Sequence, residues 1–135
     1  MPRPRIDAVA VTARNMEESL RFYRCLGFEF PPYEPDAQHI EAVALSGEAR
    51  LMIDAASLAQ ELTGRPAKPA SHSAFAMLCE TPAEVDEIAE RVKSAGFDLA
   101  AEPWDAFWGQ RYATARDPDG YEIDLFAPLN RAAQT

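Results

Sequence analysis

The chain has 135 residues, of which 47% are hydrophobic and 26% are charged, and its formal net charge is −9. These values are typical of one globular domain with a buried core, and two cysteines are too few for a disulfide scaffold. The negative charge argues against nucleic-acid binding, because phosphates would be repelled. The apolar stretch near the N-terminus is too short for a signal peptide, and no apolar run approaches a transmembrane length. We therefore expect a cytoplasmic protein with no membrane partner.

The first half of the chain predicts a strand, a helix and three further strands. Residues 6–12 alternate in hydrophobicity, which predicts a strand. A helix follows, which begins at Asn15, with Glu18 at the capping-box spacing, and ends at Gly27. The apolar stripe of this helix consists of Met16, Leu20, Tyr23 and Leu26. The further strands are predicted over residues 28–30, 38–45 and 49–55.

The second half repeats this order. A strand over residues 72–79 precedes a helix that Thr81 caps, with Pro82 at its first position and Gly96 after its end. The apolar stripe consists of Val85, Ile88, Ala89, Val92 and Ala95. Strands follow near residues 97–103, 110–116 and 120–127. The pattern predicts an α+β fold of two βαβββ modules with pseudo-twofold symmetry, residues 6–55 and 72–127, joined by a linker over 56–71 that includes a helix-breaking segment at 64–69. We expect a single domain over residues 1–135.

A tight turn, Asp117-Pro118-Asp119-Gly120, leads directly into the last strand. Proline fixes φ at the second turn position, and glycine tolerates positive φ at the fourth. Beyond the turn, alternation places Tyr121, Ile123 and Leu125 on one face and Glu122, Asp124 and Phe126 on the other. The acidic face is either the wet side of a half-buried sheet or a surface that presents acid to a ligand.

The same alternation assigns the residues that face away from the helices on the other strands. They are Ala8, Ala10 and Thr12; Arg50, Met52 and Asp54; and His72, Ala74 and Ala76. Small residues on a concave face leave volume, and polar groups that face such a volume keep it wet or ligand-filled. The pattern predicts a pocket between the sheets, with a shallow solvated sheet as the alternative.

Several motifs in combination resemble the vicinal oxygen chelate superfamily, which includes glyoxalase I, extradiol dioxygenases, fosfomycin-resistance enzymes and bleomycin-resistance proteins. The motifs are Met16-Glu17-Glu18-Ser19-Leu20-Arg21-Phe22-Tyr23 before Leu26-Gly27-Phe28, and Trp108-Gly109-Gln110-Arg111-Tyr112 before Asp117-Pro118-Asp119-Gly120. The resemblance covers residues 6–128. It implies curved mixed sheets that form a cup.

Metal-using members of that superfamily place one ligand on each of four strands, which the resemblance carries over to Ala8, Met52, His72 and Asp124. His72 and Asp124 are plausible ligands, but Ala8 has no donor atom and the thioether of Met52 is soft. Two ligands are too few for a tight site, so we expect no cofactor, and a divalent metal stays the alternative. A shift in register would instead bring in Asp7 or Asp54, which lie one or two residues from the missing positions.

The candidate ligand-binding residues come from both halves. Trp104, Phe107 and Trp108 lie in and after a predicted loop, where they either cap the core or form the wall of a pocket, and Tyr33 would be the matching wall from the first module. Glu122 and Asp124 would supply charge, with Asp124 alternatively a structural partner of Arg50. His72 is either a ligand contact or a solvated edge residue. His39 is interpreted as a surface residue.

The sequence contains no pattern that predicts a nucleophile paired with a base, and no phosphate-binding glycine loop. The resemblance leaves two functions open. The first function is non-catalytic binding, similar to bleomycin-resistance proteins, which are small acidic dimers that sequester a cationic drug. It implies a homodimer that binds a small, cationic or aromatic molecule. The second is a metal-dependent lyase, isomerase or extradiol dioxygenase-like enzyme.

Overall fold

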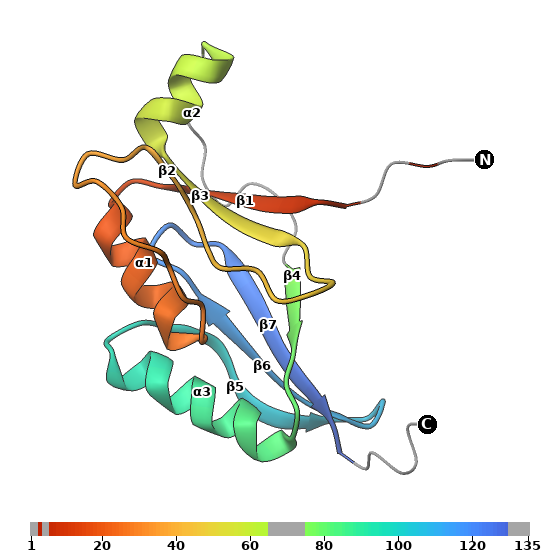
Figure 1. The fold of residues 1–135 in the computed structure, drawn as a ribbon. Coiled ribbons are helices and arrows are strands. Elements are labelled where there is room, and N and C mark those ends of the chain that lie inside the picture. Colours follow the sequence, from red (N-terminus) through yellow and green to blue (C-terminus); the bar gives the residue numbers. More distant parts are fainter. Residues whose placement is uncertain (1–2, 4–5, 65–74, 130–135) are drawn as a thin grey trace. The chain divides into compact units, whose positions relative to one another are not determined.

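The computed structural model describes residues 3, 6–64 and 75–129. Figure 1 shows the elements, which are β1 (Ala8–Ala13), α1 (Met16–Cys25), β2 (His39–Glu41), β3 (Arg50–Ala55), α2 (Ala56–Thr63), β4 (Phe75–Leu78), α3 (Pro82–Ser94), β5 (Leu99–Ala106), β6 (Gln110–Arg116) and β7 (Glu122–Pro128). The chain forms two compact units, Met1–Pro69 and Ala70–Thr135. Each unit contains its own sheet, which confirms the predicted α+β class. None of the helices in the described ranges is long and apolar enough to cross a bilayer.

The two sheets repeat one strand order. In the first unit the order is β1-β3-β2, with β1 parallel and β2 antiparallel to β3. In the second unit the order is β4-β7-β6-β5, with β4 parallel and β6 antiparallel to β7, and β5 antiparallel to β6. The strands β1, β3 and β2 therefore correspond to β4, β7 and β6.

The helix boundaries also repeat between the units. The side chain of Asn15 accepts a hydrogen bond from the N–H of Glu18 at 3.1 Å, as the side chain of Thr81 does from the N–H of Glu84 at 3.2 Å. Both helices end in a glycine with positive φ, followed by a phenylalanine whose N–H bonds back into the last turn at 3.1 Å. These contacts confirm the helix ends that the sequence predicts.

One predicted strand does not form, which leaves the first sheet with three strands instead of four. Residues 28–30 are irregular, and a backbone hydrogen bond of 2.8 Å from Val43 to Glu29 lies where the missing strand would pair. Pro31 and Pro32 follow directly, and because proline has no N–H, they cannot continue a ladder. The strand predicted over 38–45 is likewise reduced to the three residues of β2.

The predicted linker contains a helix in place of irregular chain. Residues 56–63 form α2, which ends at Gly64 with φ of 71° (Figure 1). Alanine, leucine, glutamine and glutamate in this stretch are good helix formers, and the breaker residues begin only at Gly64. The segment that was interpreted as linker by its position is therefore helical up to its first breaker.

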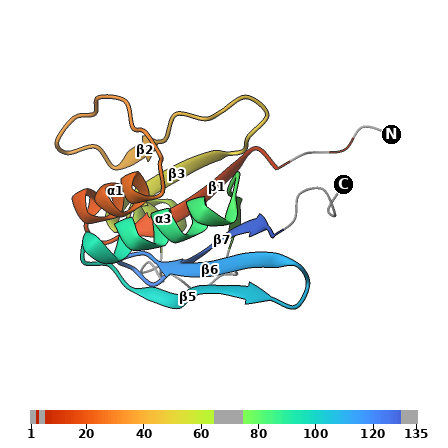
Figure 2. The ribbon, with the colours of Figure 1, turned by 90° about the horizontal axis from the view of Figure 1, so that it is seen from below.

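Each sheet buries one face against a helix. In the first unit the fully buried side chains include Val11, Leu20, Phe22, Tyr23 and Ile53. In the second unit they include Val85, Val92, Ala113, Ile123 and Leu125. Figure 2 shows α3 lying along one face of the sheet that contains β5, β6 and β7. The opposite face of each sheet, here called the open face, is left for polar and aromatic side chains.

The turn before β7 is closed by its first residue. The carboxylate of Asp117 is buried and accepts hydrogen bonds from the N–H groups of Asp119 and Tyr121, at 2.8 and 2.9 Å. Gly120 has φ of 97°, as the turn pattern predicts. Because β7 follows at once, this side chain fixes where the strand begins.

We expect Asp117→Ala to lower the free energy of unfolding by about 2 kcal/mol, because two buried N–H groups lose their acceptor. Asp117→Asn keeps an acceptor oxygen and should cost clearly less. Denaturant unfolding of the two variants measures the difference. Equal losses would show that the turn does not depend on this acceptor.

Candidate functional site

A row of aromatic rings crosses the open face of the second sheet. Antiparallel partners lie on the same face, and Tyr112 pairs with both Trp104 and Phe126. Tyr112 stacks on Phe126, with ring centroids 5.8 Å apart and planes at 21°. Trp108 meets Trp104 and Tyr112 edge-on, at 5.6 and 5.8 Å. We call these four residues the aromatic row, and each of its tryptophans is 46% exposed.

The position of the tryptophans corrects the sequence prediction. The sequence predicts Trp104 in a loop, but it lies in β5, which continues to Ala106. Of the three predicted loop aromatics, Phe107 and Trp108 lie in the turn that follows. A shift in register between Ala101 and Trp104 accommodates Pro103 within the strand. Phe107 is 94% exposed at the tip of this hairpin and contacts Trp108 edge-on.

Asp124 lies beside the aromatic row and is held by hydroxyl groups. Its two carboxylate oxygens accept hydrogen bonds from the hydroxyls of Tyr112, at 3.1 Å, and Thr114, at 2.8 Å. Burial raises the pKa of Tyr112, and the nearby charge of Asp124 adds to the shift, so the phenol remains a donor at neutral pH. A carboxylate offers about four acceptor positions. Asp124 therefore has capacity for a further donor.

The cationic side chains of the second sheet are paired with other carboxylates. Arg116 bonds Glu122 at 3.3 Å. Arg111 bonds Asp105 and Asp86, each at 2.8 Å, and thereby ties the hairpin to α3. Among residues 75–129, no arginine or lysine pairs with Asp124. Its negative charge is thus accompanied by neutral donors in the described part of this unit.

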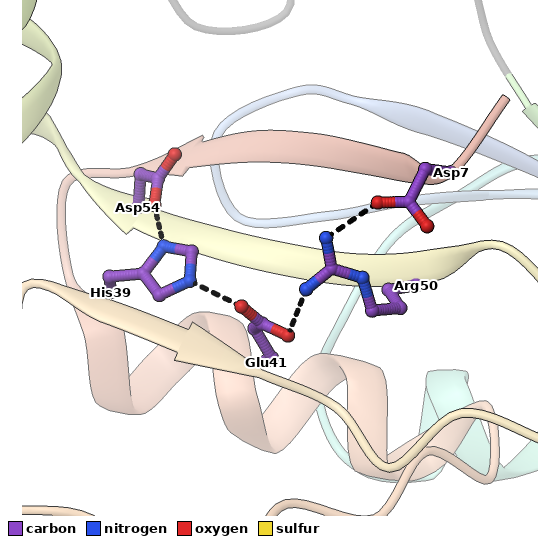
Figure 3. Close-up of polar contacts among 5 residues, drawn as sticks. All are labelled: Asp7, His39, Glu41, Arg50 and Asp54. Carbon is purple, nitrogen blue, oxygen red and sulfur yellow. Dashed lines mark hydrogen bonds and ion pairs between the residues drawn. The ribbon is translucent and has the colours of Figure 1, made fainter. Parts of the chain in front are cut away.

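The open face of the first sheet carries a chain of charged residues, shown in Figure 3 and here called the charged network: Asp7, His39, Glu41, Arg50 and Asp54. The imidazole of His39 lies 2.6 Å from Asp54 through Nδ1 and 2.9 Å from Glu41 through Nε2. The guanidinium of Arg50 lies 2.6 Å from Glu41 and 2.7 Å from Asp7. Arg50 and Asp124 thus each have their partners within their own unit.

These contacts shift the acid–base properties of the network. Hydrogen bonds raise the pKa of His39, and the bond to Glu41 contributes more than the bond to Asp54. Hydrogen bonds lower the pKa of Glu41, and the bond from His39 contributes more than the bond from Arg50. The network favours an imidazolium between two carboxylates.

Two of the four residues at the matched metal positions, Ala8 and Met52, do not suit a metal ion. Ala8 lies opposite Arg50 in the register and offers no donor atom, and Met52 offers a soft sulfur beside Ala10. No group of three or more His, Cys, Asp or Glu side chains that could hold a metal occurs within the described ranges. Asp54 is held by His39 and Asp7 by Arg50 in the charged network, so we do not assign either carboxylate as a metal ligand.

Two other candidate residues have separate outcomes. His72 lies outside the described residues. The hydroxyl of Tyr33 donates to the carboxylate of Glu17 on α1, at 3.0 and 3.2 Å to its two oxygens. This contact gives Tyr33 a role within the first unit.

Sequence reasoning missed the partners of His39. His39 is exposed, as the surface interpretation expects, and it lies opposite Asp54 and two residues before Glu41 on the same face. The alternation of residues 39–41 could have indicated the contact with Glu41. The pairing of β2 with β3 could not be read from the sequence, because register depends on which strand is the neighbour.

Two units that repeat one strand order, each with an open face, define a paired-module α+β protein. The sequence profile of the Glyoxalase/Bleomycin resistance protein/Dioxygenase superfamily matches residues 5–125, so the chain belongs to this superfamily. A glyoxalase/bleomycin resistance protein/dioxygenase from Nocardioides is similar, with 25% identity, a TM-score of 0.73, and coverage of 96% of this chain and 87% of that chain.

Two further solved structures show the same fold. A glyoxalase-related enzyme from Fulvimarina pelagi has 21% identity and a TM-score of 0.79, with 91% of this chain and 87% of that chain covered. A lactoylglutathione lyase from Agrobacterium tumefaciens has 21% identity and a TM-score of 0.68, with 94% and 96% covered. A comparison with curated proteins gave no match.

Proposed function

We propose that the protein binds a small organic molecule on the open face of its second sheet, without tight metal binding, in a sequestering or resistance role. The ligand has a planar aromatic part and a cationic part. Trp104, Phe107 and Trp108 stack on the planar part. Asp124 receives the cationic part, and Glu122 adds negative charge. In this proposal His72 is a further hydrogen-bond partner, whereas Arg50, Met52 and Tyr33 belong to the first unit and are not assigned to this surface.

The observation that carries the proposal is the surroundings of Asp124. A carboxylate that accepts from two neutral hydroxyls has unused acceptor capacity, and it lies next to a stacked pair of rings. Ammonium and amidinium groups bind carboxylates through charge-assisted hydrogen bonds and also bind aromatic faces. One cationic aromatic ligand would use both features at once.

The expected affinity is modest. A desolvated cation–aromatic contact contributes on the order of 2 kcal/mol, and a hydrogen bond to a charged group contributes about 1.5–3 kcal/mol. Two or three such contacts, reduced by the cost of ordering the ligand, correspond to a Kd of roughly micromolar.

We expect naphthylmethylamine, an aromatic cation, to raise the melting temperature, because a ligand of the folded state stabilises it by mass action. Naphthoate, which has a similar ring system and the opposite charge, should not. Asp124→Asn should weaken binding of the amine by roughly tenfold, the loss of about 1.4 kcal/mol. A thermal-shift series followed by calorimetry measures both effects.

The matched control is Glu90→Gln, which removes an exposed carboxylate from α3 and should leave binding unchanged. Trp108→Ala should weaken binding of the amine as well. If Asp124→Asn and Trp108→Ala both bind as the parent protein does, the assigned surface is wrong. Binding of naphthoate alone would contradict the charge argument and point to Arg50 and Arg111.

For metals, we expect no tight binding of Zn²⁺, Ni²⁺ or Mn²⁺ to the purified protein, because the side chains at two matched positions do not suit these ions. The double variant Ala8→His with Met52→Glu should acquire divalent-metal affinity, and the two single variants serve as controls. Calorimetry and metal analysis after gel filtration measure this. A stoichiometric metal in the parent protein would favour the metal-dependent lyase, isomerase or dioxygenase alternative.

The proposal includes a homodimer, which the family resemblance implies, and a cytoplasmic location. We expect sedimentation at micromolar concentration to give twice the chain mass of 14.9 kDa, and the protein to remain in the soluble fraction of lysed cells. Exposed tryptophans such as Trp104 and Trp108 are common interface anchors. A monomeric mass at these concentrations would remove the dimer from the proposal.

A further inference from the structure

The strand β2 is a short edge strand. It has only three residues, His39–Glu41, and irregular chain lies on both sides of it. It pairs with β3 alone in the first sheet. Three residues provide few ladder hydrogen bonds, and one backbone hydrogen bond on each side, from Ala42 to Leu51 at 3.0 Å and from Ala55 to Gln38 at 2.8 Å, extends the attachment to β3. Side-chain contacts across the pair add to this short ladder.

The charged network crosses this strand pair and reaches the third strand. His39 lies directly opposite Asp54, and Glu41 reaches Arg50 diagonally from its place opposite Met52. Arg50 then bonds Asp7, the residue before β1. Figure 3 shows these side chains in one line along the sheet. The contacts therefore link β2 through β3 to the beginning of β1.

The contacts of His39 require two ring protons. A neutral imidazole has one N–H, but both ring nitrogens of His39 face carboxylates. Only the imidazolium donates to Asp54 and Glu41 together. After deprotonation a nitrogen lone pair of His39 faces a carboxylate, which is unfavourable. Arg50 is then the remaining cation of the network beside three carboxylates, those of Asp7, Glu41 and Asp54.

We propose that His39 is a proton-dependent clasp that fastens the edge strand β2 to β3 when protonated and loosens it when neutral. The groups that face His39 are Glu41 on its own strand and Asp54 on β3. Arg50 and Asp7 act through Glu41, and the neighbouring contact of Gln38 with Ser57 at the start of α2 is neutral. This inference does not depend on the proposed ligand.

The direction of the pH effect follows from the raised pKa of His39. A base whose pKa is higher in the folded state stabilises that state below its unfolded pKa, about 6.5 for histidine, and loses the contribution as pH rises through the folded value. The clasp is therefore closed at pH 6 and opens in the alkaline range above the ordinary histidine pKa.

Hydrogen exchange tests the clasp on the full chain. At each pH the protection factor of the amides of residues 38–44, which is the intrinsic exchange rate of that sequence divided by the measured rate, is compared between the parent protein and His39→Gln. We expect the parent to be more protected by roughly two- to fivefold at pH 6, the range for exposed ion pairs, and the difference to disappear as the pH rises through the titration midpoint of His39. Proton NMR should show His39 titrating above the ordinary histidine value.

His72→Gln is the matched control, because it removes the other histidine of the chain and should keep the full pH dependence. Asp54→Asn should lower the titration midpoint of His39 even if the variant is less stable, so the test does not rely on one substitution. A difference in protection that is constant from pH 6 to 9, or a midpoint of His39 at or below the ordinary value, would overturn the proposal.

Discussion

Both sheets depend on burial of a single face against one helix. Alternate residues of each strand turn toward α1 or α3, where Val11, Ile53, Ile123 and Leu125 are fully buried. Burying a side chain of this size stabilises the fold by about 1.5–3 kcal/mol, which exceeds the contribution of an exposed ion pair. A shift of one residue would send the charged or aromatic set into the core, so this burial fixes the register and the composition of both open faces.

The two open faces differ in how their charged side chains are paired. The first satisfies its charges internally, since Arg50 and His39 each bridge two carboxylates. The second has an aromatic row beside Asp124, which accepts only from hydroxyls among the described residues. A face whose carboxylates are already paired with Arg50 and His39 has less to gain from a charged ligand than a carboxylate that has spare acceptor capacity beside aromatic rings. This difference is why the proposed ligand is assigned to the second unit.

The sequence predicted what short-range physics determines. The caps at Asn15 and Thr81, the glycine helix ends and the turn at Asp117 are local, and all are confirmed. The errors concern the context around each element. The predicted strand at 28–30 does not form, because two prolines follow it directly. The predicted linker begins with a helix, because its first residues are good helix formers. The strand β5 continues beyond Pro103 and includes Trp104, because it pairs with β6 there. The partners of His39 and Asp124 depend on strand neighbours, which a single sequence does not specify.

The central claim is that the aromatic row and Asp124 form the binding surface, and NMR with naphthylmethylamine tests it most directly. The chain has two tryptophans, so their indole N–H signals can be assigned by single substitutions. The indole of Trp108 donates to Gln110 at 2.8 Å and reports on this surface. The account predicts that both indole signals and the amides of residues 112, 114 and 124 shift with the same saturation curve. Saturable binding that moves other amides and leaves both indoles unchanged would contradict it.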